Sequence, residues 1–351
     1  MVVQLLVALL AAVALLVLAL FAANRAHGRR AERALRLEQA FEEILRGWAQ
    51  RDPRSQEIDQ LASLRNCDRI PLFHVGLRIM LELDANAAER VRNGLQHAGY
   101  LDREVANLRH RSVGRRADAC RILGRLGFAA AIPALIGRLE DRDPLVRRRA
   151  IAALGDLRAI EALDRIAATL EALGGWGDML AIIALSRMGP ASVPRVGALL
   201  ETSTSPPMIK ALLQVTAQLG LASDPAFVRQ LARHDDPEVR VEAVRALGQI
   251  PPDAESVEVC LTALDDPAWP TRALAARSIG RLGDSRAIPR LERAMGDTAY
   301  WVRHHAGQAL ARLGEPGREA LERRLADTNP FVRDMATQML FTSATARPAA
   351  A

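Results

Sequence analysis

The chain has 351 residues, half of them hydrophobic and only 4% aromatic, so its core must come mainly from Ala, Leu, Val and Ile, as in close-packed helices. The net charge of +6 is carried by arginine, because Lys210 is the only lysine, and most arginines alternate with Asp or Glu, which argues against nucleic-acid binding. Cys67, Cys120 and Cys260 lie far apart, which indicates neither a zinc knuckle nor a redox dithiol and is typical of a reducing compartment.

Residues 1–23 are predicted to form a transmembrane anchor. From Val2 to Ala23 the only polar side chain is Gln4, and a helix of 22 residues would run about 33 Å, enough for a hydrocarbon core of about 30 Å. The alternative is a cleaved signal peptide, but no Lys or Arg precedes the apolar run, and a cut after Ala23 would place Phe21 at position −3. The sequence therefore favours the anchor.

The residues after this segment predict its orientation and the next helix. Arginines crowd the C-terminal flank, so the positive-inside rule predicts a single-pass protein of the bacterial inner membrane whose remaining residues lie in the cytoplasm. Residues 24–53 have the spacing of a juxtamembrane helix. Residues 54–107 are helical in pattern but lack Gly and Pro punctuation, so they are divergent N-terminal repeats or a cap. The flanking arginines are Arg25, Arg29, Arg30, Arg33 and Arg36.

The rest of the chain is a repeat, whose clearest unit runs from Trp269 to Met295. An arginine near the start of each unit recurs at intervals of 31, 93, 32, 31 and 30 residues, and two less regular units fill the interval of 93. The period predicts about eight units over residues 108–341, and the remaining residues, 342–351, have nothing to bury and are predicted to be disordered. These arginines are Arg116, Arg147, Arg240, Arg272, Arg303 and Arg333.

Each unit carries the punctuation of two helices. Pairs such as Asp143-Pro144 and Asp236-Pro237 put a side-chain acceptor at the N-cap and proline at the first helical position. Alanines in the first helix allow close approach of its neighbours, a glycine ends that helix, and a proline opens the second helix. One such pair of helices cannot bury its apolar face alone, so the units must stack on one another.

The pattern D-P-x-V-R…A-x-x-A-L-G-x-L-G-D-x-x-A-I-P-x-L resembles the HEAT repeat, and its short period is similar to the variant named after phycobilisome lyases. The resemblance implies an all-α fold, a right-handed α-solenoid of two-helix repeats, here preceded by a single transmembrane helix. It also implies a ladder in which turn aspartates and the arginines that follow bond from repeat to repeat. Carried over to this chain, the ladder comprises Asp143, Arg147, Asp236, Arg240, Asp266, Arg272, Asp297, Arg303, Asp327 and Arg333.

No motif for chemistry stands out. None of the seven histidines is followed by Glu, so the His-Glu pairs with which a HEAT-type di-iron hydroxylase holds metal are absent. No nucleophile-elbow or phosphate-loop motif occurs either. We therefore predict no catalytic, metal-binding or cofactor-binding residues, no small-molecule substrate, and a protein that is not an enzyme.

Two groups of residues are candidates for contact with a partner. Between Asp102 and Arg149, twelve arginines face only six acids, an excess that could dock an acidic protein segment or anionic lipid, although local acids could instead neutralise it. Tryptophans near the turns could be aromatic contacts, or could pack over the seam between repeats. The candidate basic zone is Arg109, Arg111, Arg115, Arg116, Arg138, Arg142 and Arg148, and the aromatic candidates are Trp176, Trp269 and Trp301.

The predicted function is a membrane-tethered scaffold or adaptor that binds a protein partner, itself acidic or membrane-bound, through the surface of the solenoid. Repeats provide extended surface without a deep pocket, which favours binding over chemistry. The alternative is a HEAT-type enzyme, either similar to a chromophore lyase or acting on DNA.

Overall fold

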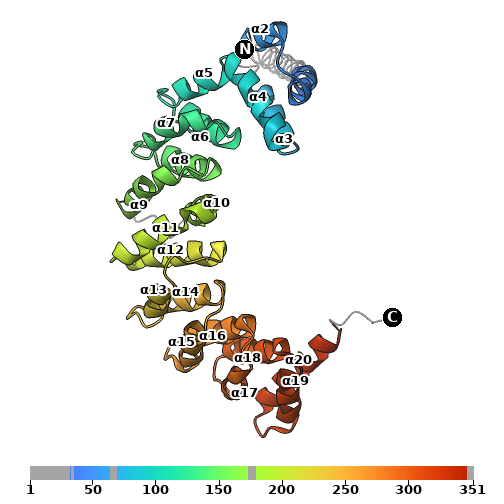
Figure 1. Cartoon of the computed structure of the whole chain (residues 1–351), viewed down its shortest axis with the longest axis vertical. Helices are drawn as coiled ribbons and strands as arrows, with labels where there is room; N and C mark the ends of the chain where they lie inside the picture. The colour runs from blue at the N-terminus through green and yellow to red at the C-terminus, as the bar shows by residue number, and fades with distance from the viewer. Residues whose placement is uncertain (1–31, 33–34, 64–68, 173–178, 346–351) are drawn as a thin grey trace, which may run out of the picture. The chain divides into compact units, whose positions relative to one another are not determined.

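The computed structural model describes residues 32, 35–63, 69–172 and 179–345 (Figure 1). All regular elements in these ranges are α- or 3-10 helices, which confirms the all-α prediction. The chain divides into two compact units, a first that ends at Leu135 and a second that begins at Ile136. The right-handed sense of the solenoid and the predicted domain boundaries stay predictions.

The predicted membrane anchor, residues 1–23, lies outside the described residues, as do most of the predicted disordered tail and Trp176. In the part of the chain that is described, no helix combines the length and apolarity needed to cross a bilayer. This finding contradicts the predicted location as a single-pass inner-membrane protein.

The first unit is organised around a helix over residues 35–50, in which Trp48 is fully buried. The indole of Trp48 lies against Gly94, where a Cβ atom would come within 2.5 Å of the ring. Its Nε1 donates a hydrogen bond to Glu57, and a hydrogen bond from Arg51 is the main cause that lowers the pKa of Glu57 to about 2. The helices of this unit are α2 Ser55–Ala62, α3 Arg69–Met80, α4 Ala85–His97, α5 Tyr100–Asn107 and α6 Val113–Arg125, and α7 Ile132–Ile136 crosses into the second unit.

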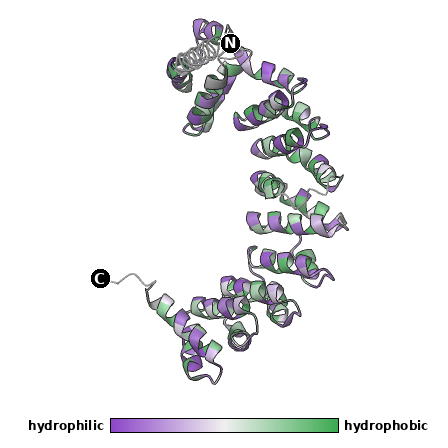
Figure 2. Cartoon of the chain, turned by 180° about the vertical axis from the view of Figure 1, so that it is seen from behind, coloured by the Kyte–Doolittle hydropathy of each residue, from purple (hydrophilic) through white to green (hydrophobic). Residues whose placement is uncertain are grey.

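The second unit is a stack of helix pairs, as the repeat predicts. Each first helix contacts the first helix of the next pair, without a break from α8 to α20 (Figure 1). Every helix carries both hydrophobic and hydrophilic residues, so each has one face to bury (Figure 2). The first helices are α8 Pro144–Asp156, α10 Met179–Arg187, α12 Pro206–Leu219, α14 Pro237–Leu247, α16 Trp269–Leu282, α18 Tyr300–Arg312 and α20 Pro330–Thr345. The second helices are α9 Leu163–Ala172, α11 Val193–Thr202, α13 Pro225–Leu231, α15 Ala254–Thr262, α17 Ile288–Ala294 and α19 Gly314–Arg323.

Small residues set the spacing of the first helices. Ala243, Ala275 and Ala306 are completely buried where successive first helices meet. At Gly155 the approach is closer still, because a Cβ atom there would lie 2.5 Å from the carbonyl oxygen of Ala184 on α10. Close-packed interiors do not absorb such an overlap without moving backbone.

The recurring arginine closes the turn of its own repeat. In all six repeats that carry it, Nη1 donates hydrogen bonds to the backbone carbonyls six and five residues earlier in the chain. In Arg272, for example, the acceptors are the carbonyls of Asp266 and Pro267, at 2.8 and 3.2 Å. The charged fork thereby satisfies carbonyl groups that no helix would otherwise bond.

Arg240 and Arg272 also reach the next repeat. The guanidinium of Arg240 forms two hydrogen bonds with Asp266, at 2.8 and 3.0 Å, and that of Arg272 bonds Asp297 in the same way, at 2.7 and 2.9 Å. Burial would raise the pKa of Asp297, but hydrogen bonds from Arg272 and from the backbone N–H of Ala299 outweigh it and hold the pKa below its usual value. Bidentate pairs of this kind fix geometry as well as charge.

The predicted ladder aspartates fall into two groups. Asp266, Asp297 and Asp327 lie six residues before their arginines and accept a backbone N–H in the turn. Asp143 and Asp236 instead cap α8 and α14, because the Asp-Pro motif there starts two residues later. In those repeats Asp141 and His234 occupy the ladder position. His110 and Ser203 occupy the same position in their own repeats.

The uncharged ladder residue His234 matches what the preceding repeat carries. Ile209 stands where the preceding repeat would carry its arginine, so no such guanidinium is available to His234. A carboxylate at this half-buried place would lack its inter-repeat counter-charge, whereas a neutral imidazole or hydroxyl still accepts the turn N–H. Asp266 and Asp297, by contrast, each follow a repeat with an arginine.

Replacing Gly155 by alanine is expected to destabilise the second unit by about 1 to 3 kcal/mol, because the new methyl group must push α10 away from α8. Urea unfolding followed by circular dichroism measures the change. Gly114→Ala is the matched control, since its Cβ would have no neighbour nearer than 3.9 Å, and it should be neutral or slightly stabilising. Equal stability of Gly155→Ala and the parent would contradict the close packing.

The turn at His110 is expected to weaken in acid. Desolvation, together with the charges of Arg115, Arg111 and Arg116, lowers the pKa of His110 below 6.5. Only the neutral ring can accept the N–H of Ser112 at Nδ1, 3.0 Å away. Between the folded pKa of His110 and about 6.5, the unfolded chain binds more protons than the folded chain. The stability that the neutral His110 ring contributes is therefore complete above this pH range, and it is lost as the pH falls through the range.

Thermal melting of the parent and of His110→Ser at pH 8 and pH 5.5 tests this expectation. The serine keeps an uncharged acceptor, as Ser203 does in its own repeat. The parent should lose more stability on acidification than the variant, and identical losses would exclude a contribution from His110.

Candidate functional site

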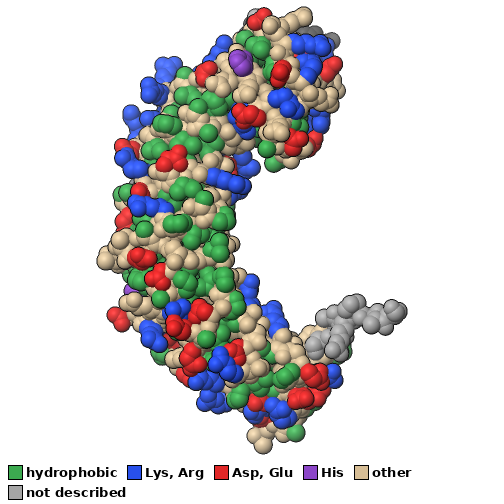
Figure 3. Space-filling model, in the orientation of Figure 1, with side chains coloured by type: hydrophobic (Ala, Val, Ile, Leu, Met, Phe, Trp, Pro, Cys, Tyr) green, Lys and Arg blue, Asp and Glu red, His purple; other side chains and the backbone are tan. Residues whose placement is uncertain are grey.

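The predicted basic zone is divided between the two compact units. Arg109, Arg111, Arg115 and Arg116 belong to the first, whereas Arg138, Arg142 and Arg148 belong to the second. Arg116 is buried in its turn, and Arg138 pairs with Asp141 at 3.3 Å. The other five are exposed. On the face seen in Figure 3, blue and red side chains are intermixed over α13 to α17.

Aromatic side chains gather at the N-terminal ends of three successive first helices. Trp269 begins α16, Tyr300 and Trp301 begin α18, and Phe331 is the second residue of α20. Their exposed fractions are 47, 48, 52 and 59% respectively, large values for residues of this size. We call these four residues the aromatic edge.

Ring contacts hold part of this edge in place. The rings of Tyr300 and Trp301 are 5.4 Å apart, and the histidines one turn later stack beneath them, His304 on Tyr300 at 5.7 Å and His305 on Trp301 at 6.0 Å. The Arg303 guanidinium lies 4.7 Å from the centre of the Phe331 ring. The edge is therefore partly ordered before any partner arrives, which lowers the entropic cost of binding.

Tyr300 and Phe331 were missed in the sequence. An aromatic residue stands at the first or second position of three consecutive first helices, at 269, 301 and 331, with the spacing of the repeat. This regular spacing is the sequence signal that could have identified them. His304 and His305 contribute ring packing, and in the described ranges no group of three potential metal ligands occurs.

A second set of charges, which is not among the sequence predictions, links the second helices. Asp164 pairs with Arg195, Glu258 with Arg290 and Glu292 with Arg323, in each case an acid with the arginine about one repeat later. An acid and an arginine 31 or 32 residues apart would have been the signal. The order is reversed between α13 and α15, where Arg229 of the earlier repeat pairs with Glu255 of the later one, at 2.6 Å.

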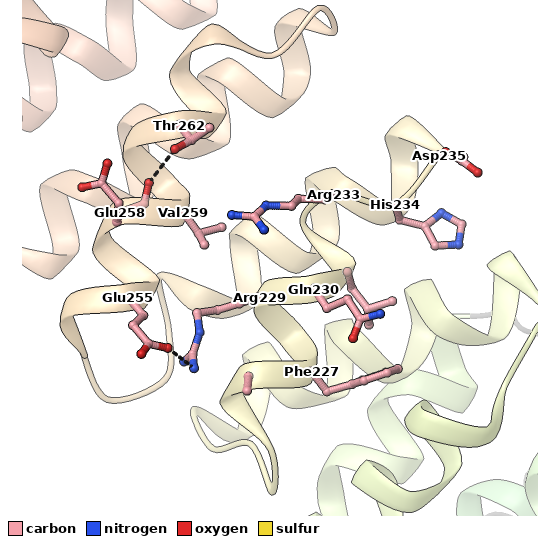
Figure 4. A pocket seen from close by; sticks show the side chains of 12 residues that line it. Phe227, Arg229, Gln230, Arg233, His234, Asp235, Glu255, Glu258, Val259 and Thr262 are labelled. Carbon is pink, nitrogen blue, oxygen red and sulfur yellow. Dashed lines mark hydrogen bonds and ion pairs between the residues drawn. The ribbon is translucent and has the colours of Figure 1, made fainter.

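A cleft of about 700 Å³ opens between α13 and α15, where this order is reversed (Figure 4). Arg229 is held by Asp253 and Glu255 on the α15 side. Arg233, just after α13, extends toward α15 beside Val259. In the described part of the chain the guanidinium of Arg233 has no hydrogen-bonding or ion-pair partner. The cleft therefore joins an apolar wall to one uncompensated cation.

Comparison with known proteins gives the family. The HEAT repeats model matches residues 105–173, 224–311 and 257–341, more than half of the chain. The phycocyanobilin lyase subunit alpha of a Picosynechococcus species is 27% identical over 174 residues, which are 48% of this chain and 56% of that protein. The chain thus spans little more than half the length of this relative.

Similar solved structures have low TM-scores. An engineered protein has a TM-score of 0.38 at 19% identity and covers 90% of this chain and 99% of its own. The complex of CpcE and CpcF of phycocyanin lyase from Nostoc sp. PCC7120 has a TM-score of 0.32 at 20% identity, covering 69% and 94%. Kap121p bound to Nup53p has a TM-score of 0.48 at 12% identity, covering 81% and 38%.

The lyase relative corrects one prediction. The absence of familiar catalytic motifs led to the expectation that this protein is not an enzyme, and similarity to a lyase subunit contradicts it. The motifs sought belong to nucleophile, phosphate and metal chemistry, so their absence could not exclude a lyase. The repeat pattern, the stacked helix pairs and the family match lead to one conclusion: the chain belongs to the HEAT-repeat family.

Proposed function

We propose that this protein is a subunit of a lyase-type assembly that acts on a bilin-bearing protein, and that it holds its protein partner on the aromatic edge. The observation that carries the lyase assignment is the 27% identity over 174 residues with a phycocyanobilin lyase subunit. The aromatic edge supports the binding role, because exposed aromatic residues are the side chains that most often dominate the energy of protein interfaces.

The remaining sequence predictions fit into this proposal as follows. An acidic segment of the partner would meet the exposed arginines of the basic zone that belong to the first unit, Arg109, Arg111 and Arg115, where opposite charge speeds association. The ladder residues would keep the repeats in register and so hold the edge in one conformation. The second candidate function is a protein adaptor without a role in chromophore transfer. The aromatic edge, taken without the similarity to a lyase subunit, favours this candidate. A DNA-acting enzyme is disfavoured, because the arginines alternate with acids.

Chromophore transfer tests the lyase assignment. The full chain, recovered with the proteins that co-purify with it, is mixed with phycocyanobilin and apo-phycocyanin, and covalently attached bilin is detected by zinc-induced fluorescence in a denaturing gel. We expect labelled protein only when the chain is present. No labelling under any combination would contradict the lyase assignment, while stoichiometric recovery of a partner would leave the adaptor function standing.

The same preparation tests the aromatic edge. Trp301→Ala should weaken partner binding by about 2 kcal/mol, roughly thirtyfold in Kd, because it removes a large, partly ordered side chain from the interface. Phe341→Ala is the matched control, since Phe341 is an aromatic residue 71% exposed outside the edge, and it should bind normally. Equal affinity of Trp301→Ala and Phe341→Ala would exclude the edge as the binding surface.

A further inference from the structure

The cleft between α13 and α15 differs in its charge pairing from the boundaries α9–α11, α15–α17 and α17–α19. Glu258, on the α15 wall, is paired with Arg290 of the following repeat. Arg229 is paired with Asp253 and Glu255. Glu255 and Glu258 of the cleft wall are thus paired with other arginines, and Asp235 points away from α15 (Figure 4). The guanidinium of Arg233 has no partner among the described residues.

The direction of the side chains supports a site around Arg233. Its guanidinium reaches across toward α15, whereas His234 and Asp235, the next two residues, point away from α15 (Figure 4). An arginine in this position offers N–H donors that can bind a carboxylate with two parallel hydrogen bonds. The turn that carries Arg233 is itself fixed, because Arg240 bonds the carbonyls of His234 and Asp235.

The rest of the lining limits what the anion can be. Val259 and Leu231 provide apolar surface, and the volume of about 700 Å³ lies in the range of small-molecule sites. Glu255 and Glu258 also line the cleft, so a ligand with several negative charges would be repelled. The lining therefore fits a single carboxylate on an apolar body.

We infer that this cleft is a binding site for a small, apolar carboxylic acid, with Arg233 as the anchor of its carboxylate and Val259 against its apolar part. Arg229 pairs with Asp253 and Glu255 on the α15 side of the cleft and so fixes the acidic wall in place. The observations that support this site come from the cleft alone, and the site is independent of the proposed lyase function.

Isothermal titration of the full-length protein with 1-naphthoate tests the inference. We expect one saturable site, and at least about tenfold weaker binding of 1-naphthalenemethanol, which keeps the apolar body and lacks the charge. Inorganic phosphate, a multiply charged anion, should also bind at least tenfold more weakly. Failure of naphthoate to saturate, or equal binding of the alcohol or of phosphate, would overturn the inference.

Three variants locate the binding. Arg233→Gln should weaken naphthoate binding by about tenfold or more, and Glu258→Gln should strengthen it, because a negative charge leaves the wall. Arg293→Gln is the matched control, since Arg293 is an exposed arginine of α17 that does not line the cleft, and it should bind like the parent. All are surface changes, and circular dichroism verifies the fold. Unchanged affinity in Arg233→Gln, or an equal loss in Arg293→Gln, would refute the site.

Discussion

The arginine that recurs near the start of six repeats bonds its own turn, and Arg240 and Arg272 also bond the aspartate of the next repeat. Arg240 and Arg272 each place one nitrogen on turn carbonyls and the rest of the fork on an acid 25 or 26 residues ahead. Because a single hairpin buries too little apolar surface to be stable, the helices must be held at one spacing over many repeats. The arginine fork supplies this spacing at the turns, while buried alanines and Gly155 supply it between the helices.

The features proposed to bind partners depend on this register. The aromatic edge exists because Trp269, Trp301 and Phe331 occupy nearly the same position in repeats whose first helices stack side by side. The cleft lies where a second regularity, the acid-to-arginine order of the second helices, is reversed at Arg229 and Glu255. A repeat protein thus gains a continuous surface from what its repeats share, and a local site from the place where one repeat differs from its neighbours.

Much of this architecture could be predicted from the sequence, because period, caps and small residues are local signals. Which residue occupies the ladder position, Asp or His, was harder to predict. Asp143 and Asp236 match the Asp-Pro motif, yet they cap helices, and the ladder position lies two residues earlier. At His234, Asp266 and Asp297 the residue in this position matches what the preceding repeat carries, which a motif within one repeat cannot reveal. The orientation of Arg233 depends on the turn after α13 and on pairs made by α15, so no local sequence pattern reveals it.

A double-mutant cycle on Arg272 and Asp297 tests most directly whether neighbouring repeats are coupled through the arginine fork. The free energy of unfolding is measured for the parent, Arg272→Ala, Asp297→Ala and the double variant. The pair is bidentate and largely buried, so we predict a coupling of about 1 to 3 kcal/mol. Strictly additive effects would show that each residue stabilises only its own turn, and would contradict the account.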